Sequence, residues 1–135
     1  MDTRYTKTHE WIVVEEDGLA SVGVTERHLL KNGRVVYIES SQKGAEYEQD
    51  EPIGVLETRE GIELVYHSPA TGEVVEVNDA LEEDTNLINV SPEDDGWILR
   101  MRLEFPDELD ALMTQDDYEF FEDEEKETED SGEDY

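Results

Sequence analysis

Short runs of aromatic and β-branched residues alternate with turn signals along the first quarter of the chain. Residues 5–14 form the first such run, and it is typical of a β-strand. Asp17-Gly18 then provides a hairpin-type turn, and the alternation of small and apolar residues over 19–24 predicts the returning strand. The chain therefore begins with a predicted β-hairpin.

A short helix is predicted directly after this hairpin. Thr25 is a suitable N-cap residue, and Asn32-Gly33 is a typical helix stop, so the pattern predicts a helix of about two turns over 26–31.

Further strands are predicted at 35–38, 52–56, 62–66, 74–77 and 97–103. Lys43-Gly44 marks a turn, and the runs 52–56 and 62–66 are expected to pair as a second hairpin. After Pro106, apolar residues recur at helical spacing, which predicts one C-terminal helix with an apolar face on the sheet: Leu109, Leu112, Met113 and Phe120. The predicted fold class is mainly β, a small barrel or sandwich with accessory helices.

Two similar segments flank the second hairpin. Residues 44–52 and 71–78 each place a turn glycine before an acidic, extended run. This pattern suggests a sandwich of two similar halves with a protruding hairpin between them.

The charge changes the interpretation of function more than of fold. The 135 residues include 39 Asp and Glu against 10 Lys and Arg, a net charge of −29. This excess argues against binding nucleic acid or an anionic membrane, which both require clustered basic residues. Repulsion between copies of so acidic a chain favours a monomer. Salt tolerance is the simplest explanation of the acidity. With no apolar leader segment at the start of the sequence, a cytoplasmic location is expected.

The acidic residues also suggest a domain boundary. Residues 122–135 contain nine carboxylates and no aliphatic side chain, so we expect a disordered acidic tail there and one domain over 1–121. The chain has no cysteine, which excludes disulfides and thiol chemistry.

No catalytic or metal-binding motif is evident. His9, His28 and His67 are too far apart in sequence to suggest a metal site, and neither an EF-hand nor a nucleophile motif is present. Adjacent carboxylates are expected by chance at this composition, so they do not indicate acid–base catalysis. We therefore expect no catalytic residue and no metal.

Several blocks resemble the glycine cleavage H-protein family in collinear order over residues 5–122. The opening Tyr-Thr-Lys-Thr-His-Glu-Trp is similar to the family's Tyr-x-Lys-x-His-Glu-Trp, and the longest match begins at Ser-Pro-Ala-Thr-Gly-Glu-Val-Val-Glu-Val-Asn. The matching blocks are 5–11, 18–26, 33–39, 68–82, 86–98 and 109–121. The resemblance implies a lipoyl/biotinyl-type β-sandwich, a flattened barrel hybrid, with a short helix in the N-terminal half and a C-terminal helix.

The resemblance also implies a carrier function. H proteins hold lipoate as an amide on a lysine at the tip of a hairpin, within a Glu-Ser-Val-Lys-Ala-like stretch. The lipoyl group accepts an aminomethyl group from a pyridoxal-phosphate decarboxylase, passes it to a tetrahydrofolate-dependent aminomethyltransferase, and is reoxidised by a flavin dehydrogenase. Such a protein is a carrier subunit rather than an enzyme.

This chain departs from the family at the attachment position. Counting from Glu57, Glu60 takes the place of the lysine, and counting back from Ser68-Pro69, Gly61 does. No lysine lies between Lys43 and Lys126. The neighbouring Arg59 is permanently protonated and is not a lipoylation acceptor.

Two functions follow from this departure. The first is a non-lipoylated binding or regulatory module that carries no cofactor and presents a partner-binding hairpin, with Arg59, Glu60, Gly61 and His67 as its residues. The second is a true carrier that bears lipoate on an atypical lysine, with Lys43 at its turn as the candidate. In either case we expect protein partners, such as glycine cleavage or lipoate-handling enzymes.

Overall fold

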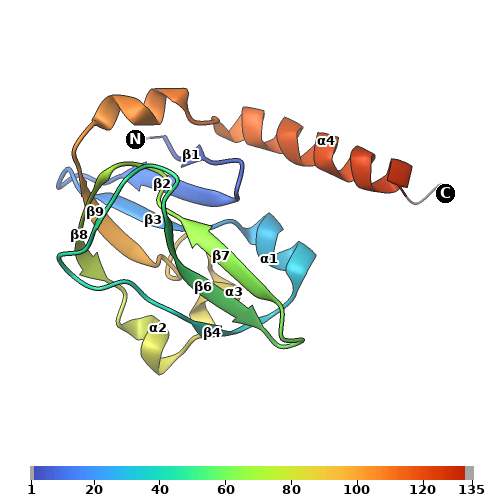
Figure 1. Cartoon of the computed structure of the whole chain (residues 1–135), viewed down its shortest axis with the longest axis horizontal. Helices are drawn as coiled ribbons and strands as arrows, with labels where there is room; N and C mark the ends of the chain where they lie inside the picture. The colour runs from blue at the N-terminus through green and yellow to red at the C-terminus, as the bar shows by residue number, and fades with distance from the viewer. Residues whose placement is uncertain (1, 133–135) are drawn as a thin grey trace.

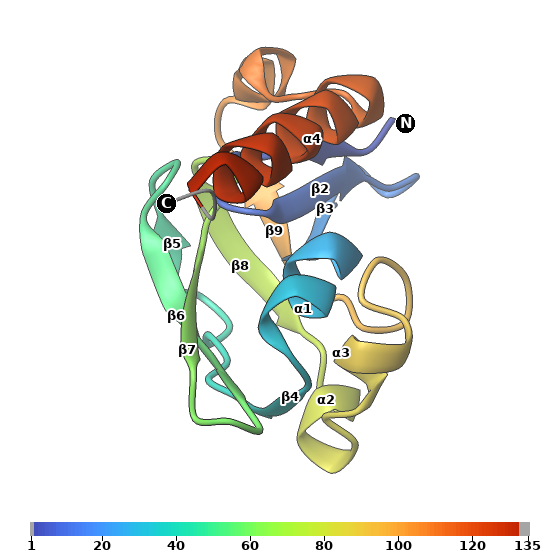
Figure 2. The same ribbon diagram turned by 90° about the vertical axis from the view of Figure 1, so that its right-hand side faces the viewer.

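The computed structural model describes residues 2–132, with side chains up to Glu124. Two antiparallel sheets face each other (Figures 1 and 2). The larger sheet has the order β1 (Arg4–Tyr5), β2 (Glu10–Val14), β3 (Ala20–Val24), β9 (Leu99–Leu103), β8 (Gly72–Val77) and β5 (Glu46–Tyr47). The smaller sheet has the order β4 (Val35–Ile38), β6 (Pro52–Thr58) and β7 (Glu63–His67).

The apolar core lies between these sheets. Val22, Leu99 and Met101 of the larger sheet are fully buried, as are Leu56 and Tyr66 of the smaller one to within 1%. Burying one large apolar side chain of this kind contributes about 1.5–3 kcal/mol. The mainly β sandwich predicted from the sequence is confirmed, and the two sheets do not close into a barrel.

The first helix forms as predicted. Helix α1 (Glu26–Asn32) begins after Thr25, whose hydroxyl accepts from the His28 N–H, and ends at Gly33. Gly33 has φ of 109°, a conformation that a residue with a side chain rarely adopts.

The predicted first strand is divided in two, which corrects the sequence interpretation. A tight turn over 6–9 separates β1 from β2, with Thr6 N–H donating to Glu10 O and His9 at φ 72°. The Thr6 and Thr8 hydroxyls bond the Glu10 carboxylate, so this segment satisfies its polar groups locally rather than in a continuous ladder.

The predicted C-terminal helix is also interrupted. A 3₁₀ helix, η1 (Pro106–Ala111), is followed by Met113, whose backbone pairs with Tyr5 of β1 in both directions. Helix α4 (Gln115–Gly132) begins only after this bridge. The pairing of Met113 with a strand distant in sequence is therefore what breaks the helical pattern.

The sequence pattern does not predict two short helices that the structure contains. Helices α2 (Ala80–Glu83) and α3 (Leu87–Val90) have four residues each, too few to show a helical period.

The two similar segments of the sequence, 44–52 and 71–78, lie side by side, because β5 and β8 pair with the register Glu46 to Glu73 and Tyr47 to Gly72.

The predicted boundary at 121/122, between one domain and an acidic tail, falls within helix α4. Helix α4 runs through 122–132 without interruption, and the side chain of Glu122 is buried against the body of the protein. Residues 133–135 of the expected disordered tail lie outside the described residues. Figure 1 shows α4 beginning near the right-hand end of β1 and β2 and extending beyond the sheets.

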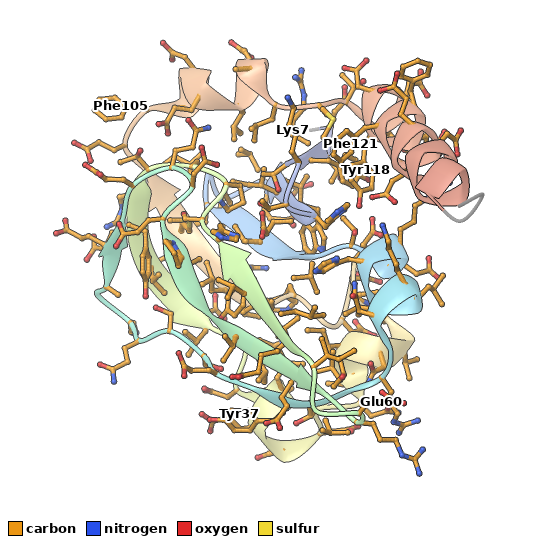
Figure 3. The ribbon with its side chains drawn as sticks, turned by 45° about the vertical axis from the view of Figure 1, so that its right-hand side comes forward. Lys7, Tyr37, Glu60, Phe105, Tyr118 and Phe121 are labelled. Carbon is orange, nitrogen blue, oxygen red and sulfur yellow. The ribbon has the colours of Figure 1, made fainter. Side chains whose placement is uncertain are left out.

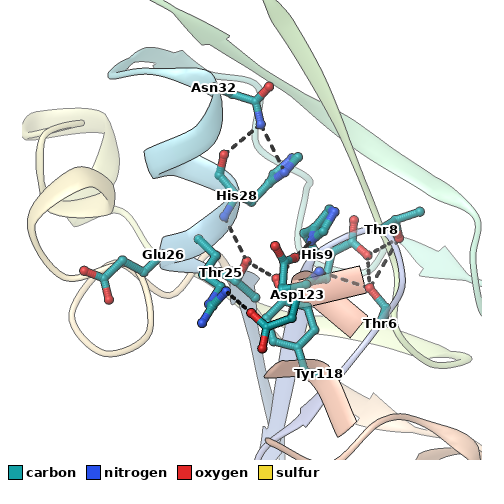
Figure 4. A network of polar contacts seen from close by, with 12 residues as sticks. Thr6, Thr8, His9, Thr25, Glu26, His28, Asn32, Tyr118 and Asp123 are labelled. Atoms are coloured by element: carbon teal, nitrogen blue, oxygen red, sulfur yellow. Dashed lines mark hydrogen bonds and ion pairs between the residues drawn. The ribbon is translucent and has the colours of Figure 1, made fainter. Parts of the chain in front are cut away.

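A polar and aromatic network holds α4 to the body (Figure 4). The Tyr118 hydroxyl lies 2.7 Å from Thr25 Oγ1 and 2.9 Å from His9 Nδ1, and His9 Nδ1 lies 2.7 Å from Glu122 Oε1. The His9 ring stacks on His28 with centroids 4.7 Å apart. The side chains of α4 thus contact both the turn before β2 and helix α1.

Glu10 joins the two sheets. Its side chain is 1% exposed and accepts hydrogen bonds from the Thr6 and Thr8 hydroxyls of the turn between β1 and β2. It also accepts from the backbone N–H of His67, at 2.9 Å, and lies 3.2 Å from the ring Nδ1 of the same residue. Because His67 ends β7, this carboxylate fixes the base of the β6–β7 hairpin.

We expect Glu10→Ala to lower the free energy of unfolding by about 3 kcal/mol, because the His67 N–H and two hydroxyls lose a buried charged acceptor. Urea denaturation of the full chain measures this loss. Glu16→Ala, at an exposed position, is the matched control and should change stability by about 0.5 kcal/mol or less. Equal losses in the two variants would contradict the structural role of Glu10.

His28 predicts a pH dependence of stability. Burial lowers the pKa of His28 to about 4, with smaller contributions from His9 and Lys31, and the Asn32 amide donates toward the unprotonated Nδ1. Below about pH 6.5 the unfolded chain binds a proton at His28 that the folded chain refuses until the pH nears 4. The stability that His28 contributes is therefore complete above pH 6.5 and is lost as the pH falls to about 4.

The measurement compares wild type with His28→Gln by urea denaturation from pH 7.5 downward. The unfolding free energy of the wild type should fall relative to that of the variant as the pH decreases, because glutamine does not titrate. A constant difference across this range would show that His28 is not the titrating group.

Candidate functional site

The β6–β7 hairpin is the part of the molecule built to present an exposed tip. Its inner face carries the buried Leu56 opposite Leu64, which hold it against the core. The Gly61 N–H donates to Thr58 O at 2.9 Å, and the Thr58 N–H donates to Ile62 O at 2.8 Å. These bonds close a three-residue loop, and Gly61 takes the left-handed position that such a loop requires, with φ of 85°.

The tip is attached to the segment that follows helix α1. The Arg59 N–H donates to Arg34 O at 2.8 Å. The Glu60 carboxylate lies over Gly33, where an added Cβ would come within 3.0 Å of Glu60 Oε2. Asn89 of α3 in turn exchanges two hydrogen bonds with the backbone of Val35, which secures the start of β4. The tip is therefore supported by two helices that are distant from it in sequence.

The structure brings together three of the four residues predicted for the hairpin site. Arg59, Glu60 and Gly61 are all exposed at the apex, and Figure 3 shows Glu60 at the end of the molecule opposite α4. His67 is not with them. It lies at the other end of β7, about 13 Å along the strand from Glu63, where its ring contacts Glu10.

Neither Lys43 nor Lys31 lies on the hairpin. Lys43 is exposed on the turn before β5, where Gly44 N–H donates to Val74 O, so it belongs to the larger sheet. Sequence analysis did not single out Lys31, which lies in the last turn of α1, two residues before Gly33. The contact between Gly33 and Glu60 and the Arg59–Arg34 hydrogen bond show that this helix end and the hairpin tip are neighbours.

The electrostatics of the hairpin are dominated by acids. Glu57 and Glu63 face each other directly across β6 and β7, both exposed, and Glu60 lies at the apex between these strands. Like charges placed opposite each other in a sheet are destabilising. Among the described residues no ion pair involves any of these three glutamates.

No group of three or more His, Cys, Asp or Glu in the described part of the chain has the geometry to hold a metal ion. No helix among the described residues is long and apolar enough to cross a membrane. The raised pKa of Tyr5, about 12, results mainly from burial and from the nearby Glu93, and this keeps its hydroxyl protonated.

Comparison with known proteins points to one family. The family model described as glycine cleavage H-protein matches residues 3–125. A glycine cleavage system H protein of Rhodospirillum rubrum is 39% identical over 117 residues, which cover 87% of this chain and 92% of the relative. One of Caulobacter vibrioides is 41% identical over 118 residues, covering 87% and 96%.

A solved structure agrees with these sequence matches. The crystal structure of a glycine cleavage system H protein from Mycobacterium marinum superposes with a TM-score of 0.77 at 28% identity. The match covers 87% of this chain and 93% of that one. The similarity thus extends over most of both chains.

The hairpin loop predicts the effect of a substitution at Gly61. Gly61→Ala should lower the unfolding free energy by about 1 kcal/mol, because a Cβ disfavours the left-handed conformation while nothing lies within 4 Å to clash with it. Gly61→Asn is the matched control and should lose less, because asparagine tolerates this conformation. Urea denaturation tests both variants, and equal losses would rule out backbone strain as the cause.

Proposed function

The chain belongs to the glycine cleavage H-protein family. We propose that it is a protein-binding module of this system that does not carry lipoate. The family consists of lipoyl carrier subunits that interact with the glycine cleavage enzymes, and its members are not catalysts themselves. The chain keeps the family's fold and a β6–β7 hairpin, which supports the proposal that it still binds protein partners.

The observation that carries this proposal is the identity of the residue at the hairpin apex. The sequence alone left Glu60 and Gly61 as equivalent positions for the attachment lysine. Gly61 has a positive φ that disfavours any long side chain, whereas Glu60 is not among the described residues with positive φ. The backbone thus favours Glu60 as the position that presents a side chain to a modifying enzyme.

A glutamate at that position cannot support the carrier chemistry. Lipoate is attached by amide formation with a primary amine, and a carboxylate has no nitrogen to acylate. The adjacent Arg59 remains protonated at any working pH and does not replace the amine. The apex therefore offers a fixed negative charge in place of a swinging arm.

The names of the relatives favour a second candidate, a lipoyl carrier that uses an atypical lysine. Lys31 is the best placed for this role among the described lysines, because its helix ends against the hairpin tip. Lys43, which the sequence suggested, is on a turn of the other sheet. The two candidates differ in one measurable property, the covalent modification of the chain.

We expect the full chain to stay unmodified when it is produced in cells that supply lipoate and a lipoate-attaching enzyme. Glu60→Lys should gain the mass of one lipoyl amide under the same conditions, because it restores an amine at a correctly built tip. Gly61→Lys is the matched control and should gain much less, since its backbone conformation opposes a lysine. Intact-mass spectrometry measures all three proteins.

A lipoyl amide on the wild-type chain would overturn the proposal and establish the carrier. Lys31→Arg and Lys43→Arg would then show which lysine bears it. An unmodified Glu60→Lys would show that the tip is no longer recognised by the attaching enzyme, and it would count against a retained family docking surface.

A further inference from the structure

Exposed apolar side chains are concentrated on the smaller sheet and its hairpin. Of eight large hydrophobic residues that are strongly exposed in the described part of the chain, four belong to this region: Val36, Tyr37, Ile62 and Val65. Tyr37 is 53% exposed and Val65 46%. A strongly acidic chain has an ample supply of polar residues for these positions, so this concentration calls for an explanation.

The strand register places two of these residues, Tyr37 and Val65, on one face. Tyr37, Glu57 and Glu63 are aligned across β4, β6 and β7, and side chains aligned in this way point to the same side of a sheet. The next row toward the hairpin base on the same side contains Val55 and Val65, with Glu39 beside them through its N–H bond to Val55 O. The opposite side carries Ile38, Leu56 and Leu64, which pack on the core.

We call this surface the outer face and define it by six residues, which are Tyr37, Val55, Val65, Glu39, Glu57 and Glu63. Figure 2 shows the hairpin at the left-hand margin of the molecule with no helix on its outer side. Figure 3 shows Tyr37 at the same end of the molecule as Glu60.

The charges on the outer face are left unbalanced. Glu57 and Glu63 are directly opposed in register, and within the described part of the chain none of the three glutamates of this face forms an ion pair. Elsewhere on the surface, exposed strand acids do have cations, as Glu73 has Arg102 at 3.1 Å and Glu76 has Arg100 at 3.6 Å. The outer face therefore combines an uncovered apolar centre with carboxylates that lack counter-charges.

We propose that the outer face of the β4–β6–β7 sheet is a docking surface for a protein partner whose apolar contact residues are bordered by arginine or lysine. This inference deepens the proposed function, on which it rests, by naming the surface and the chemistry of the partner. Tyr37 and Val65 supply the buried contact, and the three glutamates supply the complementary charge that orients the partner and speeds its approach.

Charge decides among the possible occupants. A second copy of this chain would bring the same glutamates and a further charge of −29 to the contact, so self-association is opposed. Nucleic acid and anionic membranes are repelled for the same reason. A protein surface with basic residues around an apolar centre satisfies both halves of the outer face.

The test uses a synthetic amphipathic helical peptide with a leucine stripe bordered by arginines, added to the ¹⁵N-labelled full chain at about 0.15 M salt. Amide chemical shifts locate the binding site. We expect saturable shifts concentrated on β4, β6 and β7. A peptide with serine in place of leucine should bind the outer face more weakly, and one with glutamate in place of arginine should not bind.

Variants of the outer face provide the matched controls. Tyr37→Thr combined with Val65→Thr keeps β-propensity, and it should weaken the affinity for the peptide about tenfold by removing the apolar anchors. Phe105→Thr is the control, because Phe105 is also 53% exposed but precedes η1 at the opposite end of the molecule from Tyr37 (Figure 3). The spectra themselves show whether each variant is folded.

A charge variant tests the second half of the proposal. Glu57→Gln with Glu63→Gln should weaken binding at low salt and reduce its salt dependence, whereas Glu15→Gln with Glu16→Gln, at exposed positions between β2 and β3, should leave both unchanged. Shifts centred on α4 or spread evenly over the chain would overturn the proposal. An equal loss of affinity in the Phe105 control would overturn it as well.

Failure of this inference is distinguishable from failure of the proposed function. A lipoyl amide on the wild-type chain would remove the proposed function, yet the peptide shifts would still report whether the outer face binds. An unmodified chain whose outer face shows no preferential shifts would keep the proposed function and would place its docking surface elsewhere.

Discussion

The structure depends on one buried carboxylate, that of Glu10. Its oxygens accept hydrogen bonds from two threonine hydroxyls next to β2 and from the backbone of His67 at the end of β7. A buried charge is tolerated only when its hydrogen-bonding capacity is satisfied, and here the partners come from both sheets. The requirement to satisfy Glu10 therefore fixes how the smaller sheet, and with it the hairpin, is set against the larger one.

The hairpin extends from His67 to its tip and is held in place at three points along its length. Its base is fixed at His67, its middle packs on the core through Leu56, and its tip is bonded to the backbone of Arg34. Such a construction positions whatever side chain the apex carries, independently of that side chain's chemistry. This independence explains how a chain can keep the family's fold while it presents Glu60 at the apex.

The same separation of scaffold and chemistry applies to the charge of the molecule. Nearly all carboxylates remain on the surface, so a charge of −29 is compatible with an ordinary apolar core between the sheets. This charge affects association, because a strongly acidic surface attracts basic partners and repels acidic ones before any contact is made. On the proposed outer face, an exposed apolar centre among glutamates would require a partner with both apolar contact residues and basic residues.

The sequence by itself determined the local elements and the chemistry of the apex. Thr25 and Gly33 bounded α1, the alternation of residues gave most strands of both sheets, and the absence of lysine between Lys43 and Lys126 excluded an amine on the hairpin. These features follow from capping, side-chain alternation and residue type, which act within a few residues and are therefore legible in a linear pattern.

Only the tertiary structure decided which distant residues meet. The Tyr5–Met113 bridge divides the predicted C-terminal helix. Glu122, at the start of the predicted tail, is buried beside His9. The contact of Gly33 with Glu60 made Lys31 a neighbour of the hairpin tip, while His67 was separated from it by the length of β7. Long-range contacts depend on how two sheets pack, and packing is a property of the whole chain that no local pattern contains.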